Sequence, residues 1–524
     1  MAATVQSAEY QPLGEQIRSY NRSFWFANIM EMLERWAYYG VRTVLPLYIV
    51  AASADGGLNF NHLDKGFIFA WWAWWQSLLP MFTGGYADRY GYKKTVAVSV
   101  GIKTIGYLLM GTQHSFWGFF TGCMFLATGT AIFKPGVQGL IAHNVSDKNA
   151  SVGWGIFYQL VNIGGFLGPI TANLLRENHP WSWVFYGNAV LVALNFVSLL
   201  MFKEPDIPRP PKLESAKEMV AEFWGVFVES IKNLFFQPRL FLFVLIFSGF
   251  WLTFNEMFDL LPNFLDDWIS STNVLMAWGQ FWVHVPVLSQ VMGAQAAIAS
   301  AAKGGNVAPE LMLNVDPGAI VFLMIPIAAI ASRFKPLPAI CLGILVTAIG
   351  MLLLGSTTGG WLCAGGIFVF AIGEMLASPR TNDYFASIAP ADKKGLYLGY
   401  ANVPNAIGWG IGSWIGGELY QYHADKVQLA QDYMVSHFGM TRAAVNALPK
   451  DQVLSTMAAK AHLTVAQAQQ LLWNLDHPVT IWYVFAAIGL ASMIGMLIYN
   501  LVVTRIDRQA LEKVIPADNA TIAS

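Results

Sequence analysis

Four charged residues lie inside an apolar stretch near the N-terminus that is long enough to cross a lipid bilayer. The stretch covers about residues 23–52 and contains the segment EMLERWAYYG, residues 31–40. On insertion scales, an Arg, Lys or Asp at the centre of a membrane helix costs about 2.5–3.5 kcal/mol. At the helical period, one face of this stretch carries Glu31, Glu34, Arg35, Tyr38 and Arg42. That face must therefore contact other helices or water, which predicts a bundle of several membrane helices and a functional site within it.

The composition supports a protein that crosses the membrane many times. The chain has 524 residues, of which 55% are hydrophobic and 12% are charged, and its mean hydropathy is +0.45. A net charge of −1 gives no argument for nucleic-acid binding. Cys123, Cys341 and Cys363 lie in apolar runs, so we expect buried thiols, with no disulfide framework and no metal site. The polar first twenty residues do not resemble a removable signal peptide.

The hydropathy pattern predicts twelve membrane-spanning helices. They lie near residues 23–52, 62–85, 95–113, 116–142, 152–175, 182–202, 239–265, 314–332, 337–355, 360–379, 395–420 and 478–504. Lys and Arg gather in the connections on one side, for example at Arg89 and Lys93 and at Lys393 and Lys394. Because such residues favour the cytoplasmic side, we expect both termini in the cytoplasm and the chain in the cytoplasmic (inner) membrane.

The spans divide into two sets of six. We expect a bundle over residues 1–202, a linker over 203–238, a second bundle over 239–504 and a cytoplasmic tail over 505–524. The linker begins with the extended segment EPDIPRPPK and continues as an amphipathic stretch, which predicts a helix on the membrane interface. Six spans, a linker and six more spans predict an all-α architecture of two six-helix bundles around a central cavity, with a binding site near the midplane.

Two insertions are expected on the outer face of the second bundle. Residues 269–312 are apolar but interrupted by Gly and Pro, which predicts short helices. Residues 421–477 are rich in Ala and Gln and form either a small cap or a loosely attached hairpin. Thr441 and Thr464 suit the N-cap position of helices in this second insertion.

The connection after the second span reads GGYADRYGYKK and resembles a signature of the major facilitators. It combines a Gly pair for close helix approach with an acidic residue and a basic cluster at the membrane surface. Asp88 and Arg89 are therefore expected to connect helix ends on that side, which is a gating role.

Four further motifs resemble those of the proton-dependent oligopeptide transporter (POT/PTR) family of the major facilitator superfamily. The first is Glu31-x-x-Glu34-Arg35-Trp36-x-Tyr38-Tyr39-Gly40, in which the family usually has Phe at the Trp position. The others are Lys134-Pro135 in the fourth span, FYQLVNIGGFLGP with Asn162 in the fifth, and Gly373-Glu374-x-x-x-Ser378-Pro379 in the tenth. Together they cover nearly the whole transmembrane region.

The resemblance implies a role for each of these residues. Arg35, Arg42 and Lys134 would face the carboxylate of a ligand, and Glu374 would face its ammonium group. The resemblance also implies that Tyr38 and Asn162 hydrogen-bond the ligand. It also implies that Glu31 and Glu34 take part in proton coupling with Arg35. Lys134 and Glu374 are a second proton-sensitive pair if the fold brings the fourth and tenth helices together. Glu256 is a further candidate for proton coupling, because an ionisable group so deep in a span is expensive unless it is used.

The chain departs from the family in two places. In the seventh helix the family has a carboxylate four residues after the Trp of a Phe-Trp pair, where this chain has Asn255. The nearest acids are Glu256, which is turned by about 100° and reaches the cavity only if the helix is distorted, and Asp259. In the eleventh helix Ala401 stands where an aromatic residue is common. These differences affect the shape of the pocket and hence ligand preference.

These features predict a proton-coupled symporter that imports di- and tripeptides by alternating access, acts as a monomer, and has no cofactor beyond the coupling proton. The alternative is a symporter of the same fold for another small solute, such as an amino-acid derivative or a peptide-like compound. An enzyme or a membrane sensor is not supported, because no nucleophile–base pair, phosphate-binding loop or signalling domain is apparent, and the histidines lie mostly in connections.

Overall fold

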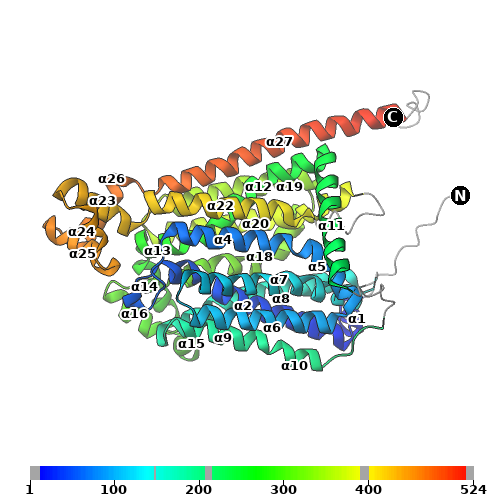
Figure 1. The fold of residues 1–524 in the computed structure, drawn as a ribbon, viewed down its shortest axis with the longest axis horizontal. Helices are drawn as coiled ribbons and strands as arrows, with labels where there is room; N and C mark the ends of the chain where they lie inside the picture. The colour runs from blue at the N-terminus through cyan, green and yellow to red at the C-terminus, as the bar shows by residue number, and fades with distance from the viewer. Residues whose placement is uncertain (1–11, 147–148, 207–214, 390–399, 515–524) are drawn as a thin grey trace.

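The computed structural model describes residues 12–146, 149–206, 215–389 and 400–514, and these are almost entirely helical. Long helices run side by side along one axis, and α1 (Leu13–Ser19) and the C-terminal end of α27 (Thr480–Val514) lie at the same end of the bundle, which we call the terminal end (Figure 1). The opposite end carries a group of short helices over residues 426–476, which we call the cap (Figure 1).

The helices are arranged in two halves with connecting segments. The N-terminal half contains α1 (Leu13–Ser19), α2 (Arg22–Arg42), α3 (Leu45–Val50), α4 (His62–Leu78), α5 (Pro80–Tyr90), α6 (Tyr92–Thr112), α7 (Phe116–Ala142), α8 (Ala150–Asn178), α9 (Ser182–Ala193) and α10 (Asn195–Leu200). The C-terminal half contains α12 (Pro238–Asp259), α13 (Leu261–Trp268), α18 (Val315–Ala331), α19 (Pro336–Gly355), α20 (Gly360–Ile388), α22 (Asn402–His423) and α27 (Thr480–Val514). The connecting helices are α11 (Ala216–Phe236), α14 (Thr272–Trp282), α15 (Pro286–Val291), α16 (Ala294–Ala302), α17 (Pro309–Leu313), α23 (Lys426–Phe438), α24 (Arg442–Asn446), α25 (Lys450–Lys460) and α26 (Val465–Asp476).

Over the described residues, each of the twelve expected spans coincides with one helix or with two consecutive helices, as predicted for the all-α membrane fold; the start of the eleventh, residues 395–399, lies outside them. Eight helical segments of the described chain are long and apolar enough to cross a membrane by length and composition alone. The spans built from α2, α4, α8 and α22 are not among them, and each of these helices contributes to the cavity or to the interface between the halves.

Helix α27 runs to Val514, beyond the expected end of the last span at residue 504. Lys393 and Lys394, used above to orient the chain, lie outside the described residues.

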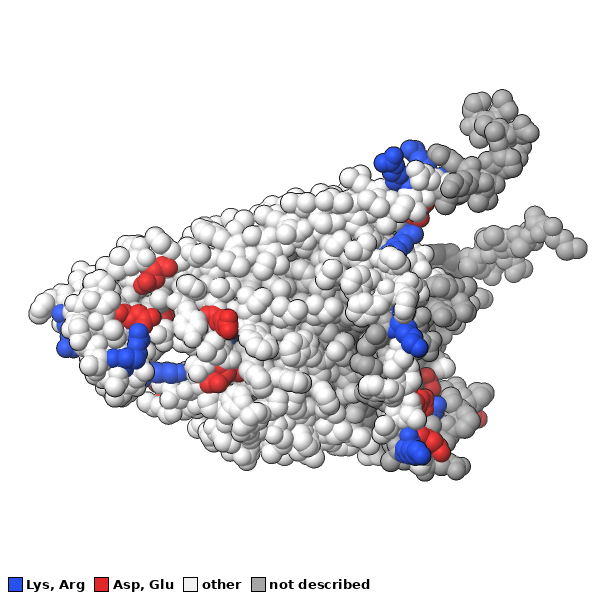
Figure 2. Space-filling model, turned by 45° about the horizontal axis from the view of Figure 1, so that its top comes forward, with Lys and Arg blue, Asp and Glu red and all other residues white. Residues whose placement is uncertain are grey.

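The distribution of charge fits a membrane-spanning body. Lys, Arg, Asp and Glu side chains gather at the two ends of the visible surface, and the broad belt between them carries none (Figure 2). Large apolar side chains of the membrane-spanning helices are exposed, among them Leu200, Phe322 and Ile325. Apolar side chains facing outward are expected where the solvent is lipid.

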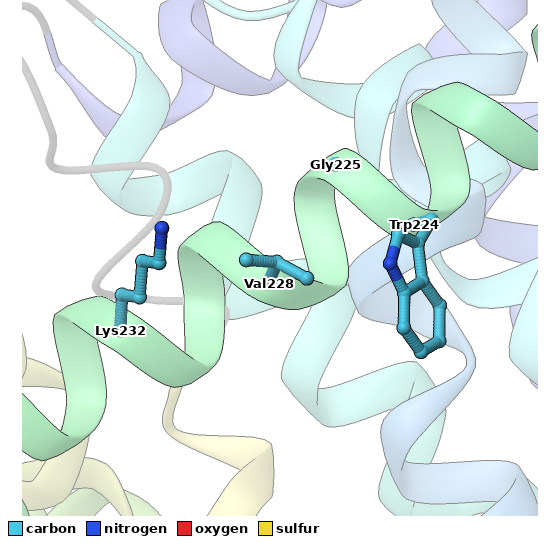
Figure 3. Close-up of a pocket in the computed structure, with 4 residues that line it drawn as sticks. All are labelled: Trp224, Gly225, Val228 and Lys232. Atoms are coloured by element: carbon cyan, nitrogen blue, oxygen red, sulfur yellow. The ribbon is translucent and has the colours of Figure 1, made fainter.

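Helix α11 links the two halves and crosses the terminal end almost at right angles to the long helices (Figure 1). Ser215 caps its N-terminus by accepting a hydrogen bond from the amide of Glu218. A shallow hollow on this helix is lined by Trp224, Gly225, Val228 and Lys232 (Figure 3). An apolar stripe flanked by a lysine is typical of a helix that lies in a membrane interface.

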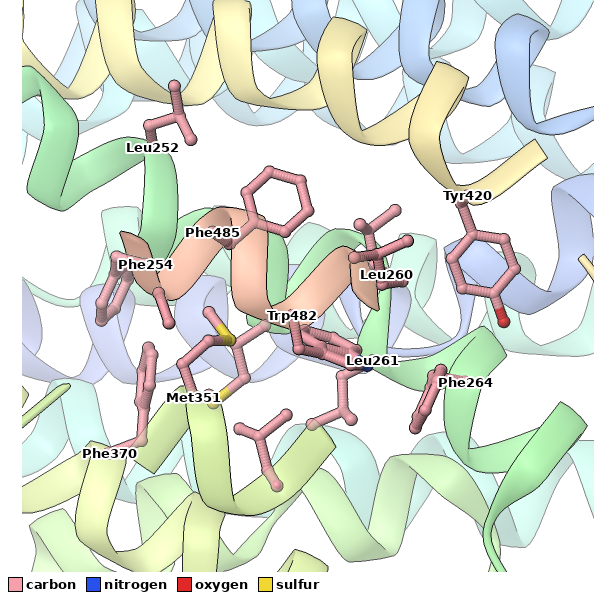
Figure 4. Close-up of a cluster of buried hydrophobic side chains, with 14 of the residues drawn as sticks. Leu252, Phe254, Leu260, Leu261, Phe264, Met351, Phe370, Tyr420, Trp482 and Phe485 are labelled. Atoms are coloured by element: carbon pink, nitrogen blue, oxygen red, sulfur yellow. The ribbon is translucent and has the colours of Figure 1, made fainter. Parts of the chain in front are cut away.

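The core of the C-terminal half is built around α12 and α27. Phe254 stacks on Phe370 of α20, and Phe264 of α13 packs edge-on against Trp482 of α27 (Figure 4). The same apolar cluster continues into the cap, whose Leu429, Met434, Val453, Met457 and Leu472 are buried.

The insertion over residues 421–477 therefore forms a packed cap and not a loose hairpin. Thr441 and Thr464 are N-caps, as predicted, and Thr464 forms a capping box with Gln467. Lys450 of the cap donates hydrogen bonds to the carbonyls of Val50 and Phe60 in the N-terminal half, at 3.2 and 2.8 Å.

Close contact between α2 and α8 positions the charged face of α2. A Cβ atom at Gly168 would lie 2.6 Å from the backbone nitrogen of Gly40, and one at Gly164 would lie 2.5 Å from the carbonyl oxygen of Met32. Glycine at these positions lets the two helix backbones meet, as small residues do at membrane-helix interfaces.

We predict opposite effects for two Gly→Ala changes in the same helix, α8. Gly168→Ala should destabilise the protein by about 1–3 kcal/mol, because overpacking a helix contact forces backbone shifts. Gly155→Ala is the matched control, since nothing lies within 4 Å of a Cβ atom there, and alanine favours a helix by roughly 1 kcal/mol over glycine. Thermal unfolding of the detergent-purified variants measures both. Equal melting temperatures would contradict the tight α2–α8 contact.

Candidate functional site

A cavity of about 250 Å³ lies between the two halves of the bundle. Its lining comes from α2, α4, α7 and α8 on one wall and from α12, α18, α20 and α22 on the other. All six residues expected to bind a ligand line it: Arg35, Tyr38, Arg42, Lys134, Asn162 and Glu374.

The two acids of the first motif lie behind Arg35 and not in the cavity lining. Glu34 accepts a hydrogen bond from Nε of Arg35 and a second one, at 2.5 Å, from Nζ of Lys103. Glu31 lies 3.5 Å from Nε of Arg35, at the i,i+4 spacing expected from the sequence, and its Oε2 has no hydrogen-bond partner in the described chain. Both acids are almost fully buried, at 1% and 0% exposure. Glu34 is thus held by two cations, whereas Glu31 keeps one oxygen available.

Lys103 was not identified from the sequence, although a signal for it exists. It is the lysine within the apolar stretch of α6, and it is completely buried. The argument that singled out Glu374, an ionisable residue deep in a span, applies equally to Lys103. Its ammonium group also lies 4.0 Å from the ring centroid of Phe133, a favourable cation–π arrangement.

Arg42 connects the two halves on the cap side of the cavity. Its guanidinium pairs with Asp259 at the end of α12. The other oxygen of Asp259 accepts hydrogen bonds from Trp409 at 3.1 Å and Ser413 at 2.6 Å. This carboxylate is therefore fully engaged, and Asp259 is the seventh-helix acid that meets the N-terminal half.

A second buried lysine reinforces this contact between the halves. Lys65 of α4 donates to the carbonyl of Asp259 at 2.9 Å and to Oδ1 of Asn263 at 2.7 Å. Asn263 in turn donates to the carbonyl of Pro46 at 3.0 Å. Nearer the cap, Arg176 and Glu310 form another ion pair across the halves, at 2.8 Å. The halves are therefore joined by buried polar contacts at this end.

Glu256 does not line the cavity. Helix α12 is continuous from Pro238 to Asp259, so the one-residue offset from Asn255 turns Glu256 toward α22. A Cβ atom at Gly412 or Gly416 would lie within 2.6 Å of its carboxylate oxygens, so these glycines make the space that Glu256 occupies.

The family position in α12, Asn255, does line the cavity, and it hydrogen-bonds Asn405 of α22 at 3.1 Å. Ala401 is not part of the lining, whereas Asn405, one turn later, is.

Tyr38 and Asn162 already have partners in the structure. The Tyr38 hydroxyl accepts a hydrogen bond from Gln76 at 3.2 Å, and the Arg35 guanidinium lies 4.9 Å from its ring centroid. Asn162 donates to the carbonyl of Tyr158, one turn earlier in α8, at 2.9 Å. The side-chain oxygen of Asn162 is the atom left to meet a ligand.

Lys134 and Glu374 face the cavity from opposite halves but form no ion pair with each other or with another described residue. Oε2 of Glu374 has no hydrogen-bond partner in the described chain. The charged neighbour that acts on Glu374 is another acid, Asp316 of α18, which also lines the cavity.

The expected gating residues make contacts at the terminal end. Asp88 accepts a hydrogen bond from the Tyr92 hydroxyl, which ties α5 to α6. Arg89 forms a two-point ion pair with Glu222 of α11, with one N–O distance of 3.0 Å. These contacts connect the linker helix to the N-terminal half.

The site can bind charge of both signs but has no metal centre within the described ranges, where no group of three His, Cys, Asp or Glu side chains could hold an ion. The N-terminal wall includes Lys134 and Arg35, and the C-terminal wall includes the acids Asp316 and Glu374. A zwitterion could therefore contact both halves at once.

Comparisons with known proteins support this picture. Residues 24–413 match the Major Facilitator Superfamily. A peptide transporter of Yersinia enterocolitica is 29% identical over 173 residues, covering 32% of this chain and 34% of that protein. The multidrug resistance protein MdtH of Escherichia coli is 23% identical over 350 residues, covering 66% of this chain and 74% of that protein. The match to the Yersinia protein thus spans about a third of the length of that relative.

A crystal structure of the peptide transporter POT in complex with sulfate shares the fold, with a TM-score of 0.64, 17% identity, and coverage of 93% of this chain and 95% of that one. Because the superfamily consists of membrane transporters, the expectation that this chain is not an enzyme is confirmed. The resemblance seen in the sequence motifs is confirmed as well: the chain belongs to the Major Facilitator Superfamily and has the fold of its proton-dependent oligopeptide transporter branch.

Proposed function

We propose that this protein is a proton-coupled symporter that imports di- and tripeptides by alternating access. The observation that carries the proposal is the separation of charge across the cavity. Lys134 and Arg35 lie on the N-terminal wall, and Glu374 lies on the C-terminal wall. A short peptide has a carboxylate at one end and an ammonium group at the other, so it would attract the two halves toward each other. The name of the Yersinia relative supports a peptide substrate.

The contact between Arg42 and Asp259 gives alternating access a physical obstacle. Opening the cap end requires this buried pair to separate, and removing one partner of such a pair typically costs about 3–5 kcal/mol. Ligand binding and protonation would have to supply a compensating free energy.

We assign proton coupling to the charged cluster of Glu31, Glu34 and Lys103 behind Arg35. Glu31 is the acid that gains and loses the proton. An arginine side chain keeps its proton in proteins, so the charge state of Glu31 and Glu34 decides whether the Arg35 guanidinium is free to bind a ligand. Glu34 is held by Arg35 and Lys103 together, whereas Glu31 has a free oxygen. Protonation of Glu31 would remove one competitor for the guanidinium and favour its contact with an incoming carboxylate. Such coupling between proton and ligand is reciprocal.

The second candidate function is symport of another small solute by the same fold, such as an amino-acid derivative or a peptide-like compound. The observation that favours it is Asn255, a neutral residue where the family has a cavity carboxylate. Competition of unlabelled dipeptides against uptake of a labelled solute separates the two.

We place the protein in the cytoplasmic membrane with both termini in the cytoplasm, and we propose that it works as a monomer, with protons as coupling ions and no other cofactor.

The first functional prediction concerns Lys134. We expect Lys134→Ala to abolish proton-driven dipeptide uptake. The variant lacks the cation of the cavity lining that has no ion-pair partner among the described residues, so the ligand carboxylate has no lysine to bind. Uptake into liposomes under an imposed proton gradient is the measurement, and Lys303→Ala, an exposed lysine outside the cavity lining, is the control. Wild-type uptake by Lys134→Ala would exclude Lys134 from the site.

The second functional prediction separates the two acids of α2. Glu31→Gln should lose accumulation against a gradient but retain part of the exchange of labelled for unlabelled peptide, since exchange needs no net proton movement. Glu34→Gln should lose both, because it leaves Arg35 and Lys103 buried without their shared counter-ion. Arg35→Ala should also lose both activities.

Gradient-driven uptake and counterflow on the same reconstituted variants measure these two activities. Glu31→Asp, which keeps a titratable group, serves as the control and should retain some accumulation. If Glu31→Gln concentrates peptide as well as the wild type does, coupling lies elsewhere, with Lys134, Glu256 or Glu374 as the remaining candidates.

A further inference from the structure

The C-terminal wall of the cavity carries one carboxylate more than a simple zwitterion requires. Two of the charged residues in the lining have an ion-pair partner: Arg42 pairs with Asp259, and Arg35 pairs with Glu34. This leaves Lys134, Glu374 and Asp316 without an ion-pair partner among the described residues. If the ligand carboxylate meets Lys134 and its ammonium group meets Glu374, Asp316 remains uncompensated.

Asp316 is built into the cavity and is not a surface acid. It lies in the first turn of α18 and is 3% exposed, and its Oδ1 has no hydrogen-bond partner in the described chain. The N-terminal turn of a helix is a favourable place for a carboxylate. Burying a carboxylate without a partner is costly, so a cation in the cavity would be stabilised there.

Packing places Asp316 beside Glu374. Helices α18 and α20 join through an apolar cluster that includes Ala319 and Ile320 of α18 and Ala371 and Met375 of α20. Ala319 lies three residues after Asp316, and Ala371 and Met375 flank Glu374 on its own helix. The two acids act on each other electrostatically, and both act on the Tyr39 hydroxyl. They therefore form one acidic patch on the C-terminal wall.

We propose that Asp316 is a specificity-determining residue that, together with Glu374, selects peptides with a second positive charge near the N-terminus, such as those with an N-terminal lysine. This inference rests on the proposed function, because it assumes that the peptide ammonium group lies at Glu374. The side-chain ammonium group of the first residue would then pair with Asp316. Pairing of a partly desolvated cation and anion is stronger than the same pairing in water.

Two dipeptides that differ in one charge test the proposal. Lysyl-alanine and norleucyl-alanine have first residues with the same carbon chain, and only the lysine side chain carries an ammonium group. Binding of each to the purified full-length protein is measured by titration calorimetry for the wild type and for Asp316→Asn. We expect the wild type to bind lysyl-alanine about tenfold more tightly, which corresponds to about 1.4 kcal/mol. The Asp316→Asn variant should bind the two dipeptides with equal affinity.

The outcomes distinguish this inference from the proposed function. Equal binding of the two dipeptides by the wild type, or a preference for lysyl-alanine that survives in Asp316→Asn, overturns the role of Asp316 alone. If the wild type binds neither dipeptide, peptide transport itself is overturned, and this inference with it. If Asp316→Asn does not purify as a folded protein, Asp316→Ala replaces it and must show the same loss of preference.

Discussion

The architecture depends on the high free energy of a charge in a medium without water. An ionised side chain inside a membrane bundle is stable only when an opposite charge and hydrogen bonds meet it. Glu34 satisfies this condition through Arg35 and Lys103, and Asp259 satisfies it through Arg42, Trp409 and Ser413. These groups form fixed contacts that hold α2 in register with α6 on one side and with α12 and α22 on the other.

Two arginines of α2, Arg35 and Arg42, lie in such contacts, but their partners differ. Arg35 is bound within the N-terminal half, whereas Arg42, two turns later, is bound to the C-terminal half. Tyr38 lies between them, under the Arg35 guanidinium and hydrogen-bonded to Gln76 of α4. A single helix therefore connects the Arg35 cluster in the N-terminal half with the Arg42–Asp259 contact between the halves.

Much of the fold could be predicted from the sequence, because hydropathy and helix caps are local properties. The twelve spans and the N-caps at Thr441 and Thr464 follow from them. The partners of the buried charges could not be predicted in the same way, because they depend on which helices face each other. Lys103 is the example: its position deep in a span is visible in the sequence, but its contact with Glu34 requires the packing of α6 beside α2.

The offset at α12 shows a second limit of sequence reasoning. One residue separates Asn255 in the cavity from Glu256 against the glycines of α22, and only the phase of the helix decides between them. The sequence also does not decide whether the insertion over residues 421–477 is a packed cap or a loose hairpin. Its packing depends on apolar side chains of the C-terminal half that lie far away in the chain.

The charges around the cavity also limit which combinations of ligand and proton the proposed transporter could carry. A zwitterionic peptide adds no net charge, so it cannot balance the excess acid formed by Asp316 and Glu374 against Lys134. The balance is restored by one further positive charge, which is either a proton or a cationic group of the ligand itself. The two compete for the same carboxylates. In the proposed function, a cationic peptide would thus take the place of a proton on the C-terminal wall, and Glu31 is the proposed proton site of the N-terminal half. Coupling and selectivity then arise from one requirement, the neutralisation of buried charge before the two halves can close over the ligand.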